Sequence, residues 1–187
     1  MAAELDGRFR LVAGAFSRDA EKSAAAGRAW GLDPDRAYAD YRMMIEAEAA
    51  RPDGARVVVV ATPNDTHLAV ASAALRAGLH VMSDKPATRD LAEALQLART
   101  VRESGRLYGL TYVYTGYPMV REARGIVGRG ELGAIRKVVV EYQQGWLSRP
   151  IEREGSRQAE WRADPARAGV GGCIGDIGVH AFNLAEF

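Results

Sequence analysis

The chain has 187 residues, with 25 Lys plus Arg against 24 Asp plus Glu and 48% hydrophobic residues, a balance typical of a globular protein. A net charge of +1 argues against a nucleic-acid-binding protein, which needs a basic surface. The longest apolar run, residues 57–61, is far shorter than the ~20 residues that span a bilayer, and the single cysteine, Cys173, fits a reducing cytosol. We therefore expect a cytoplasmic protein with no nucleic-acid or membrane partner.

Strands and helices alternate over residues 9–111, which is typical of a parallel α/β sheet. The predicted strands are residues 9–16, 56–61, 79–82 and 107–111, and the predicted helices are residues 19–30, 40–50, 64–76 and 88–104. The β-branched run at 56–61 predicts a central strand that is buried on both faces. The last helix carries an apolar stripe at Leu91, Leu95, Ala98 and Val101.

The pattern changes after residue 115. A helix is predicted at 118–127 and a strand at 135–142, followed by a polar, Arg-rich loop at 148–167 and a glycine-rich turn at 169–175. A last helix begins near Asp176. No Gly-x-Gly-x-x-Gly turn occurs near the N-terminus, and the predicted strand at 135–142 lacks partner strands. We therefore expect a fragment of a longer protein.

Polar residues follow three of the predicted strands, at the sheet edge where parallel α/β folds bind ligands. Ser17 and Arg18 follow the first strand, where a dinucleotide fold contacts the adenosine ribose, and Arg18 could meet a 2′-phosphate. The choice between NAD and NADP therefore stays open. The later strands are followed by Thr62, Pro63, Asn64 and His67 and by Asp84 and Lys85.

Each of these clusters also has a purely structural interpretation. Ser17 could start a turn and Arg18 could be a solvated charge. Asn64 or Thr66 could cap a helix, and His67 could be a surface residue of that helix. Residues 84–86 could form the start of a helix, with Pro86 in its first turn.

The segment from Gly172 to His180 holds a carboxylate and an imidazole four residues apart. On a helix that starts near Asp176, Asp176 and His180 share one face, and a carboxylate beside an imidazole suits general base catalysis. Alternatively, Asp176 is only a helix cap and His180 an ordinary helical residue. The His, Cys and carboxylate residues show no metal-ligand spacing, so we expect no metal site.

Three blocks together resemble the Gfo/Idh/MocA oxidoreductases, which include glucose-fructose oxidoreductase and inositol dehydrogenase. They are residues 61–67, residues 78–86 with the Lys85-Pro86 pair, and residues 172–180 with Asp176 and His180. The resemblance implies a Rossmann domain at residues 1–115 that lacks its Gly-rich turn. It further implies, at residues 116–187, the start of an α/β domain with a large open sheet, through which full-length members form dimers or tetramers.

The resemblance also implies a function, which is hydride transfer between a nicotinamide cofactor and a hydroxyl carbon of a sugar, inositol or related polyol. The cofactor is NAD or NADP, with a slight preference for NAD. Lys85 would contact the nicotinamide ribose and the substrate hydroxyl, and His180 would take the hydroxyl proton. Asp176 would orient His180 or bind substrate, and Asp84 stands where many members have Glu.

Some features leave other functions open. Trp146, Trp161 and Arg162 could bind the substrate, or the two tryptophans could be packing residues. Many members carry Asn in the segment that here reads Tyr112-Val113-Tyr114. The competing hypotheses are an NAD-dependent glycosidase, a non-catalytic sensor and a truncated product. Without a Gly-rich turn to hold the pyrophosphate, we expect this chain to bind NADH weakly or not at all.

Overall fold

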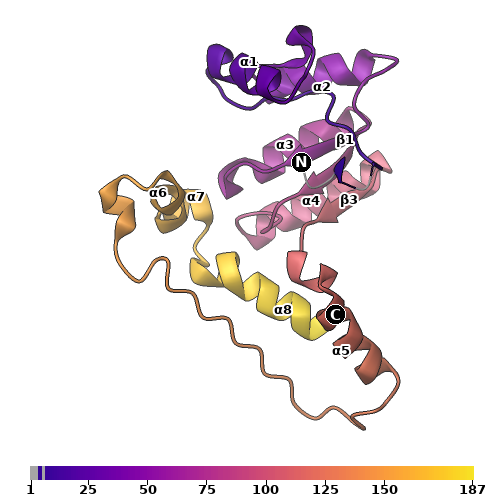
Figure 1. The fold of residues 1–187 in the computed structure, drawn as a ribbon, viewed down its shortest axis with the longest axis vertical. Helices are drawn as coiled ribbons and strands as arrows, with labels where there is room; N and C mark the ends of the chain where they lie inside the picture. The colour runs from indigo at the N-terminus through magenta and orange to yellow at the C-terminus, as the bar shows by residue number, and fades with distance from the viewer. Residues whose placement is uncertain (1–3, 6) are drawn as a thin grey trace. The chain divides into compact units, whose positions relative to one another are not determined.

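The computed structural model describes residues 4–5 and 7–187. The chain divides into two compact units, each assembled from separated stretches. The first unit is Met1–Val60, Ala69–Met82 and Leu97–Tyr108, and the second is Ala61–Leu68, Ser83–Gln96 and Gly109–Phe187. Three strands form one parallel sheet in the order β1 (Val57–Val60), β2 (His80–Ser83) and β3 (Tyr108–Leu110) (Figure 1).

The strands are joined by helices α3 (Asn64–Arg76) and α4 (Leu91–Ser104). These elements confirm the strands and helices predicted between residues 56 and 111. The expected burial of β1 on both faces is wrong: Val58 and Val60 are buried, but Val59 is 57% exposed. The central strand β2 has the same alternating burial as β1, so one face of the described sheet is buried and the other is partly exposed.

The core of the first unit consists of small and branched apolar side chains. The buried residues are Ile45, Val58, Val60, Val70, Ala71, Ala74, Leu75, Leu79, Val81 and Leu97. The stripe expected on α4 is misplaced, because the helix buries Leu97 and Thr100 and exposes Leu91 and Leu95. Its polar Thr100 replaces an apolar residue on the buried face, so apolar spacing alone pointed to the wrong side of the helix.

The strand expected at residues 9–16 is wrong, since this segment forms a single parallel bridge between Gly14 and Ala37. A strand forms where consecutive residues hydrogen-bond to a neighbouring strand through their backbone N–H and C=O groups. Among the described residues, only Gly14 of this segment pairs in this way. The two helices expected next are confirmed as α1 (Ala20–Ala29), which Asp19 caps, and α2 (Tyr41–Ala50), which Asp40 caps. The 3₁₀ turn η2 (Pro34–Arg36) separates them.

A buried ion pair joins η2 to α2 in the first unit. The Arg36 guanidinium donates to both carboxylate oxygens of Glu48, and both residues are buried. The Tyr38 hydroxyl and the Ala55 N–H donate to the same carboxylate, at 3.1 and 2.9 Å. Burial alone would raise the pKa of Glu48, but these hydrogen bonds outweigh it and lower the pKa.

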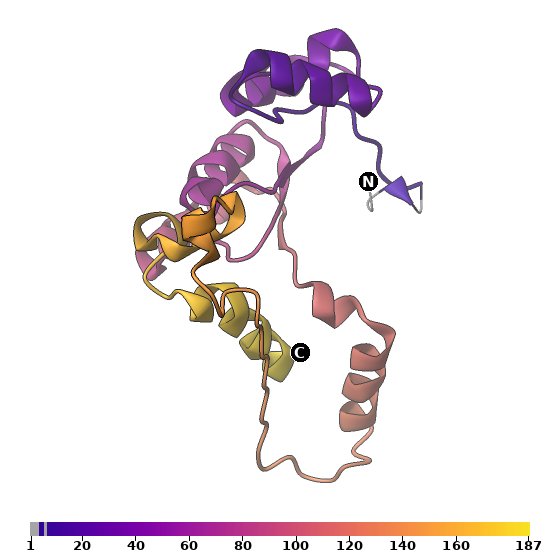
Figure 2. The ribbon, with the colours of Figure 1, turned by 60° about the vertical axis from the view of Figure 1, so that its left-hand side comes forward.

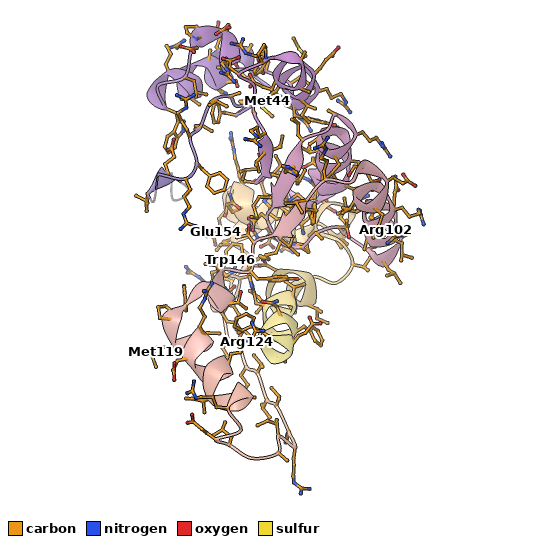
Figure 3. All side chains as sticks on the ribbon, turned by 90° about the vertical axis from the view of Figure 1, so that its right-hand side faces the viewer. Met44, Arg102, Met119, Arg124, Trp146 and Glu154 are labelled. Atoms are coloured by element: carbon orange, nitrogen blue, oxygen red, sulfur yellow. The ribbon has the colours of Figure 1, made fainter. Side chains whose placement is uncertain are left out.

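In the second unit, η3 (Val113–Gly116) leads into α5 (Pro118–Gly128), which confirms the helix predicted there. Arg124 on α5 lies over the Phe187 ring, with 4.2 Å between the guanidinium carbon and the ring centroid (Figure 3). The strand expected at 135–142 is wrong, because residues 134–145 have no regular structure (Figure 2). Apolar β-formers do not make a strand without a neighbouring strand to bond.

The loop expected at 148–167 is also wrong, because most of it is helical. It contains η4 (Ile151–Glu154), α6 (Arg157–Ala163) and α7 (Pro165–Ala168). Ser156 accepts from the Ala159 N–H at the start of α6, and Asp164 accepts from the Ala166 N–H at the start of α7. Short, well-capped helices suit this polar segment better than an open loop.

The chain ends in a π-helical turn, η5 (Ile174–Gly178), that continues into α8 (Val179–Glu186). The predicted helix is therefore present but starts earlier, so Asp176 lies inside the turn and is not its cap. Within the described residues, no helix combines the length and apolar character needed to cross a membrane.

Candidate functional site

A polar cavity of about 240 Å³ lies within the second unit. Three separate parts of the chain line it, namely the loop after β2, the segment from η3 to Trp146, and the helices from α6 onward. The lining residues are Lys85, Tyr114, Tyr142, Gln144, Trp146, Arg162, Asp176, Ile177 and His180. The structure therefore brings the three predicted catalytic residues, Lys85, Asp176 and His180, to one cavity.

Lys85 and Asp176 form the most direct contact in the cavity. The Lys85 Nζ donates to the Asp176 carboxylate Oδ1 and to the Asp176 backbone carbonyl, each at 2.5 Å. The Lys85 side chain is 15% exposed and the Asp176 side chain 23% exposed, so solvent screens the pair only in part. The peptide bond that follows Lys85 is cis. Asp176 thus fixes the Lys85 ammonium, a contact that was not part of its expected role of orienting His180 or binding substrate.

His180 is 6% exposed, and its Nδ1 has no hydrogen-bond partner among the described residues. Burial lowers the pKa of His180, and the positive charge of Lys85 lowers it further, against a smaller opposite effect of Asp176. Tyr112 and Tyr114 pack edge-on against the ring, and Tyr142 lies beside it. His180 is therefore held neutral, the form in which an imidazole accepts a proton.

The phenols of Tyr114 and Tyr142 form a hydrogen-bonded pair on the cavity wall. The Gln144 amide donates to the Tyr142 hydroxyl at 2.8 Å. The bond to Tyr142, together with burial, raises the pKa of Tyr114 to about 12. The Tyr114 phenol consequently stays neutral, and the hydroxyl groups of both tyrosines can bond a ligand.

Arg162 provides a second cation in the cavity. Its guanidinium stacks on Trp161, 4.1 Å from the ring centroid, and lies 5.6 Å from the centroid of Trp146. Its Nε is 3.7 Å from the Asp176 carboxylate. Trp146 and Arg162 line the cavity, whereas Trp161 is not among its lining residues and stacks on Arg162. Substrate binding by these three residues stays a prediction.

The residues predicted to hold the cofactor divide between the two units. In the second unit the Thr62 hydroxyl pairs with that of Thr66, next to Pro63. The Asp84 carboxylate accepts from the Lys85 N–H at 2.8 Å. Residues 84–86 are not the start of a helix, since α4 begins only at Leu91. These side chains thus border the loop that carries Lys85.

Asn64 and His67 are buried and bonded to backbone carbonyls. The Asn64 Nδ2 donates to the Ala168 carbonyl at 3.0 Å. Both ring nitrogens of His67 lie 2.7 Å from carbonyl oxygens, and the side chain is 1% exposed. The interpretation of His67 as a surface residue is therefore wrong.

Ser17 and Arg18 lie in the first unit and are not buried. The Ser17 hydroxyl accepts from the Asp19 N–H at 3.1 Å, so Ser17 starts the turn before α1. A contact of either residue with an adenosine ribose stays a prediction.

Sequence reasoning missed Tyr142, Gln144 and Ile177 as cavity residues, and it treated Tyr114 only as a departure from the family pattern. No sequence period marks Tyr142 and Gln144, because residues 134–145 have no regular structure. Across the part of the chain that the structure describes, no group of three His, Cys, Asp or Glu residues could hold a metal ion.

Two family models match this chain. Residues 2–112 match the oxidoreductase family with an NAD-binding Rossmann fold, and residues 120–187 match the Gfo/Idh/MocA C-terminal domain. A curated relative, the uncharacterized oxidoreductase YfiI of Bacillus subtilis, is 36% identical over 178 residues, which are 95% of this chain and 45% of the relative.

Solved structures of inositol dehydrogenase homologues also superpose on this chain. The inositol dehydrogenase homologue of Azotobacter vinelandii in complex with NAD⁺ superposes with a TM-score of 0.90 at 45% identity, over 95% of this chain and 46% of that one. An inositol dehydrogenase homologue from the same organism, in complex with NADH and myo-inositol, has a TM-score of 0.85 at 42% identity, over 95% and 44% of the two chains. The chain thus spans less than half the length of these relatives. From its sequence, its fold and these matches, the chain belongs to the Gfo/Idh/MocA family of oxidoreductases.

Proposed function

We propose that the protein is an NAD(P)-dependent oxidoreductase that transfers a hydride between a nicotinamide cofactor and a hydroxyl carbon of a sugar, inositol or related polyol. The observation that carries the proposal is the cavity in which the Lys85 ammonium, fixed by Asp176, lies with the neutral imidazole of His180. Oxidation of an alcohol needs both an acceptor for the hydroxyl proton and a positive charge near the developing alkoxide.

The residues around Lys85 fit the nicotinamide end of such a cofactor. The Thr62 hydroxyl and the Asp84 carboxylate can bond ribose hydroxyls, as the Lys85 ammonium can. The unpartnered, buried Nδ1 of His180 is a polar atom that still lacks a partner among the described residues. When bound, the nicotinamide ring supplies the hydride acceptor or donor. The NAD⁺ and NADH complexes of the Azotobacter homologues support NAD over NADP.

Each of the three central residues then has a separate role. Lys85 donates to the substrate hydroxyl and stabilises the negative charge on its oxygen as the proton leaves. His180 accepts that proton. Asp176 holds the Lys85 ammonium in place and can accept from a neighbouring substrate hydroxyl through its second oxygen.

The remaining wall of the cavity suits a polyhydroxylated substrate. Trp146 presents an aromatic face for sugar C–H groups, and Gln144 and the two phenols present hydrogen-bonding groups. Arg162 adds a charged hydrogen-bond donor, and its guanidinium stacks on the Trp161 ring. The myo-inositol complex of the Azotobacter homologue supports this substrate class.

The test is a spectrophotometric screen of the purified full-length protein with NAD⁺ or NADP⁺ and a panel of sugars and inositols. Full length is needed because we expect these 187 residues alone to bind NADH weakly or not at all. We expect NADH or NADPH to accumulate in proportion to oxidised substrate. Lys85→Met should lower kcat/KM by a factor of about 10² to 10³, because a transition-state donor is lost. Lys22→Met is the matched control, since Lys22 is an exposed lysine on α1.

Two results would contradict the proposal. A glycosidase would cleave its substrate with no net formation of reduced cofactor, and a substrate panel without any cofactor turnover would exclude the dehydrogenase. Lys85→Arg separates charge from geometry: it keeps the cation but replaces a compact, rotatable donor with a planar one, so we expect a large loss of activity here too.

We also propose the division into a cofactor domain at residues 1–115 and a second domain at residues 116–187. The gap between the two matched family models, residues 113–119, supports this boundary. A homo-oligomer and a cytoplasmic location stay predictions. Gel filtration with light scattering checks the first, and cell fractionation checks the second.

A further inference from the structure

The buried imidazole of His67 lies between two backbone carbonyls. Its Nδ1 is 2.7 Å from the Pro86 oxygen, and its Nε2 is 2.7 Å from the Thr62 oxygen. A carbonyl oxygen only accepts hydrogen bonds, so the ring donates to a carbonyl that faces one of its N–H groups. The imidazole thus lies between two backbone carbonyls from different loops.

The carbonyl bonded by Nδ1 belongs to the residue next to Lys85. At the other end of this segment, the Ser83 carbonyl accepts from the Thr111 backbone N–H at 2.9 Å and from its hydroxyl at 3.1 Å. Lys85 is therefore carried by a short segment whose backbone is held at Ser83 and at Pro86. The position of that backbone decides whether the long, flexible lysine side chain reaches Asp176.

The same turn of α3 also holds the other half of the site. Asn64, three residues before His67, donates to the carbonyl of Ala168, the last residue of α7. The glycine-rich turn that follows Ala168 leads into η5, which contains Asp176. Residues 64–67 thus bond two backbone segments, one that carries Lys85 and one that precedes Asp176.

We propose that His67 and Asn64 are positioning residues that hold Lys85 and Asp176 in register without touching substrate or cofactor. His67 acts through its contacts with the Pro86 and Thr62 carbonyls, and Asn64 acts through the Ala168 carbonyl. The proposal rests on the proposed function only in that Lys85 and Asp176 are taken as the catalytic pair. It replaces the expected contact of both side chains with the cofactor.

The lysines of this chain make the proposal measurable without substrate or cofactor. They are Lys22, Lys85 and Lys137. In limited reductive methylation of the purified protein, followed by peptide mass spectrometry, Lys85 should react more slowly than the two exposed lysines. In His67→Gln, whose amide does not lie between the two carbonyls as the ring does, the Lys85 rate should rise about tenfold, the scale of one lost hydrogen bond. Asn64→Ala should have the same effect in the same direction.

The matched control is Asp65→Asn. Asp65 lies on the same turn of α3, and its carboxylate is 3.7 Å from Arg167 of α7, but this ion pair is partly exposed. Its loss should leave the Lys85 rate unchanged, as expected for a surface pair. A Lys85 rate that stays at the unsubstituted value in both His67→Gln and Asn64→Ala would overturn the proposal.

Nuclear magnetic resonance of the unsubstituted protein decides the case even where a variant does not fold. We expect at least one ring N–H of His67 to exchange slowly with solvent in a ¹⁵N-labelled sample, because the ring is buried and bonds a carbonyl. Rapid exchange of every ring proton would contradict these contacts. Neither this measurement nor the lysine methylation depends on turnover of a substrate. The positioning role of His67 and Asn64 and the proposed oxidoreductase activity can therefore be refuted separately. With a turned-over substrate, His67→Gln should lower kcat and leave KM nearly unchanged.

Discussion

Tyr114 packs edge-on against the imidazole of His180, with their ring centroids 4.7 Å apart. Tyr112 makes a second edge contact with the same ring. These phenols remove water from His180, and burial is the main reason that its pKa lies below the ordinary value. The aromatic wall therefore acts on the chemistry, because it keeps the base unprotonated at a lower pH than a solvated histidine would allow.

The first prediction follows from this packing. In the direction of alcohol oxidation, kcat/KM should rise with pH as His180 loses its proton, and the midpoint of that rise should lie below 6.5, the ordinary histidine value. Tyr114→Ala admits water, so the midpoint should move to higher pH. Tyr114→Phe keeps the ring and should leave the midpoint nearly in place. Equal midpoints in the alanine variant and the unsubstituted protein would argue against burial as the cause.

The second prediction concerns the buried ion pair of the first unit. Glu48→Gln leaves the Arg36 guanidinium buried beside a neutral amide, so we expect a loss of about 3 kcal/mol or more in the free energy of unfolding, measured by urea titration. Arg42→Ala is the control, because the pair of Arg42 with Asp40 is exposed. It should cost less than about 1 kcal/mol. A similar small loss for Glu48→Gln would contradict the prediction.

The same carboxylate gives the protein a pH dependence of known sign. The pKa of Glu48 is lowered on folding from its ordinary value of 4.5, so its stabilising contribution is present above that value. It is lost as the pH falls from 4.5 through the folded-state pKa. We expect the unsubstituted protein to lose stability across this window, and Glu48→Gln to lose less.

The third prediction concerns the turn that precedes Asp176. Gly169 has φ 93° and ψ 158°, a conformation that is essentially restricted to glycine, and an added Cβ would lie 2.6 Å from the Arg89 carbonyl oxygen. Gly169→Ala should therefore destabilise the turn by about 1–3 kcal/mol and lower kcat. Gly171→Ala, where the nearest atom to an added Cβ is 3.4 Å away, is the control. Thermal unfolding and initial rates of both variants check the difference.

Local signals predicted the helices of this chain well and its unpaired strands poorly. The helix at residues 64–76 matches its predicted bounds, and the helix predicted at 19–30 is present as α1. The segments 9–16 and 135–142 have strand composition, but a strand depends on a neighbour that composition does not reveal. The helices at 151–168 were within reach of sequence analysis, since Ser156, Asp164 and Pro165 are ordinary helix-start signals.

The candidate site was predictable where residue type and spacing follow strand ends or a family motif, as for Lys85, Asp176 and His180. The phenol of Tyr142 was not, because residues 134–145 follow no regular period that would fix the direction of a side chain. Nor could the sequence show that Asp176 forms its side-chain hydrogen bond with Lys85 and not with His180. Spacing on one helix says nothing about a lysine from a distant loop.

The contact between Lys85 and the backbone carbonyl of Asp176 has a consequence for how this site can change. A substitution at position 176 removes the carboxylate but leaves the carbonyl, so the ammonium keeps one of its two anchors. Loss of the carboxylate should therefore weaken the hold on the ammonium without abolishing it, and it leaves a partly buried charge without its ion-pair partner. The backbone carbonyl is an anchor that no side-chain substitution at position 176 can remove.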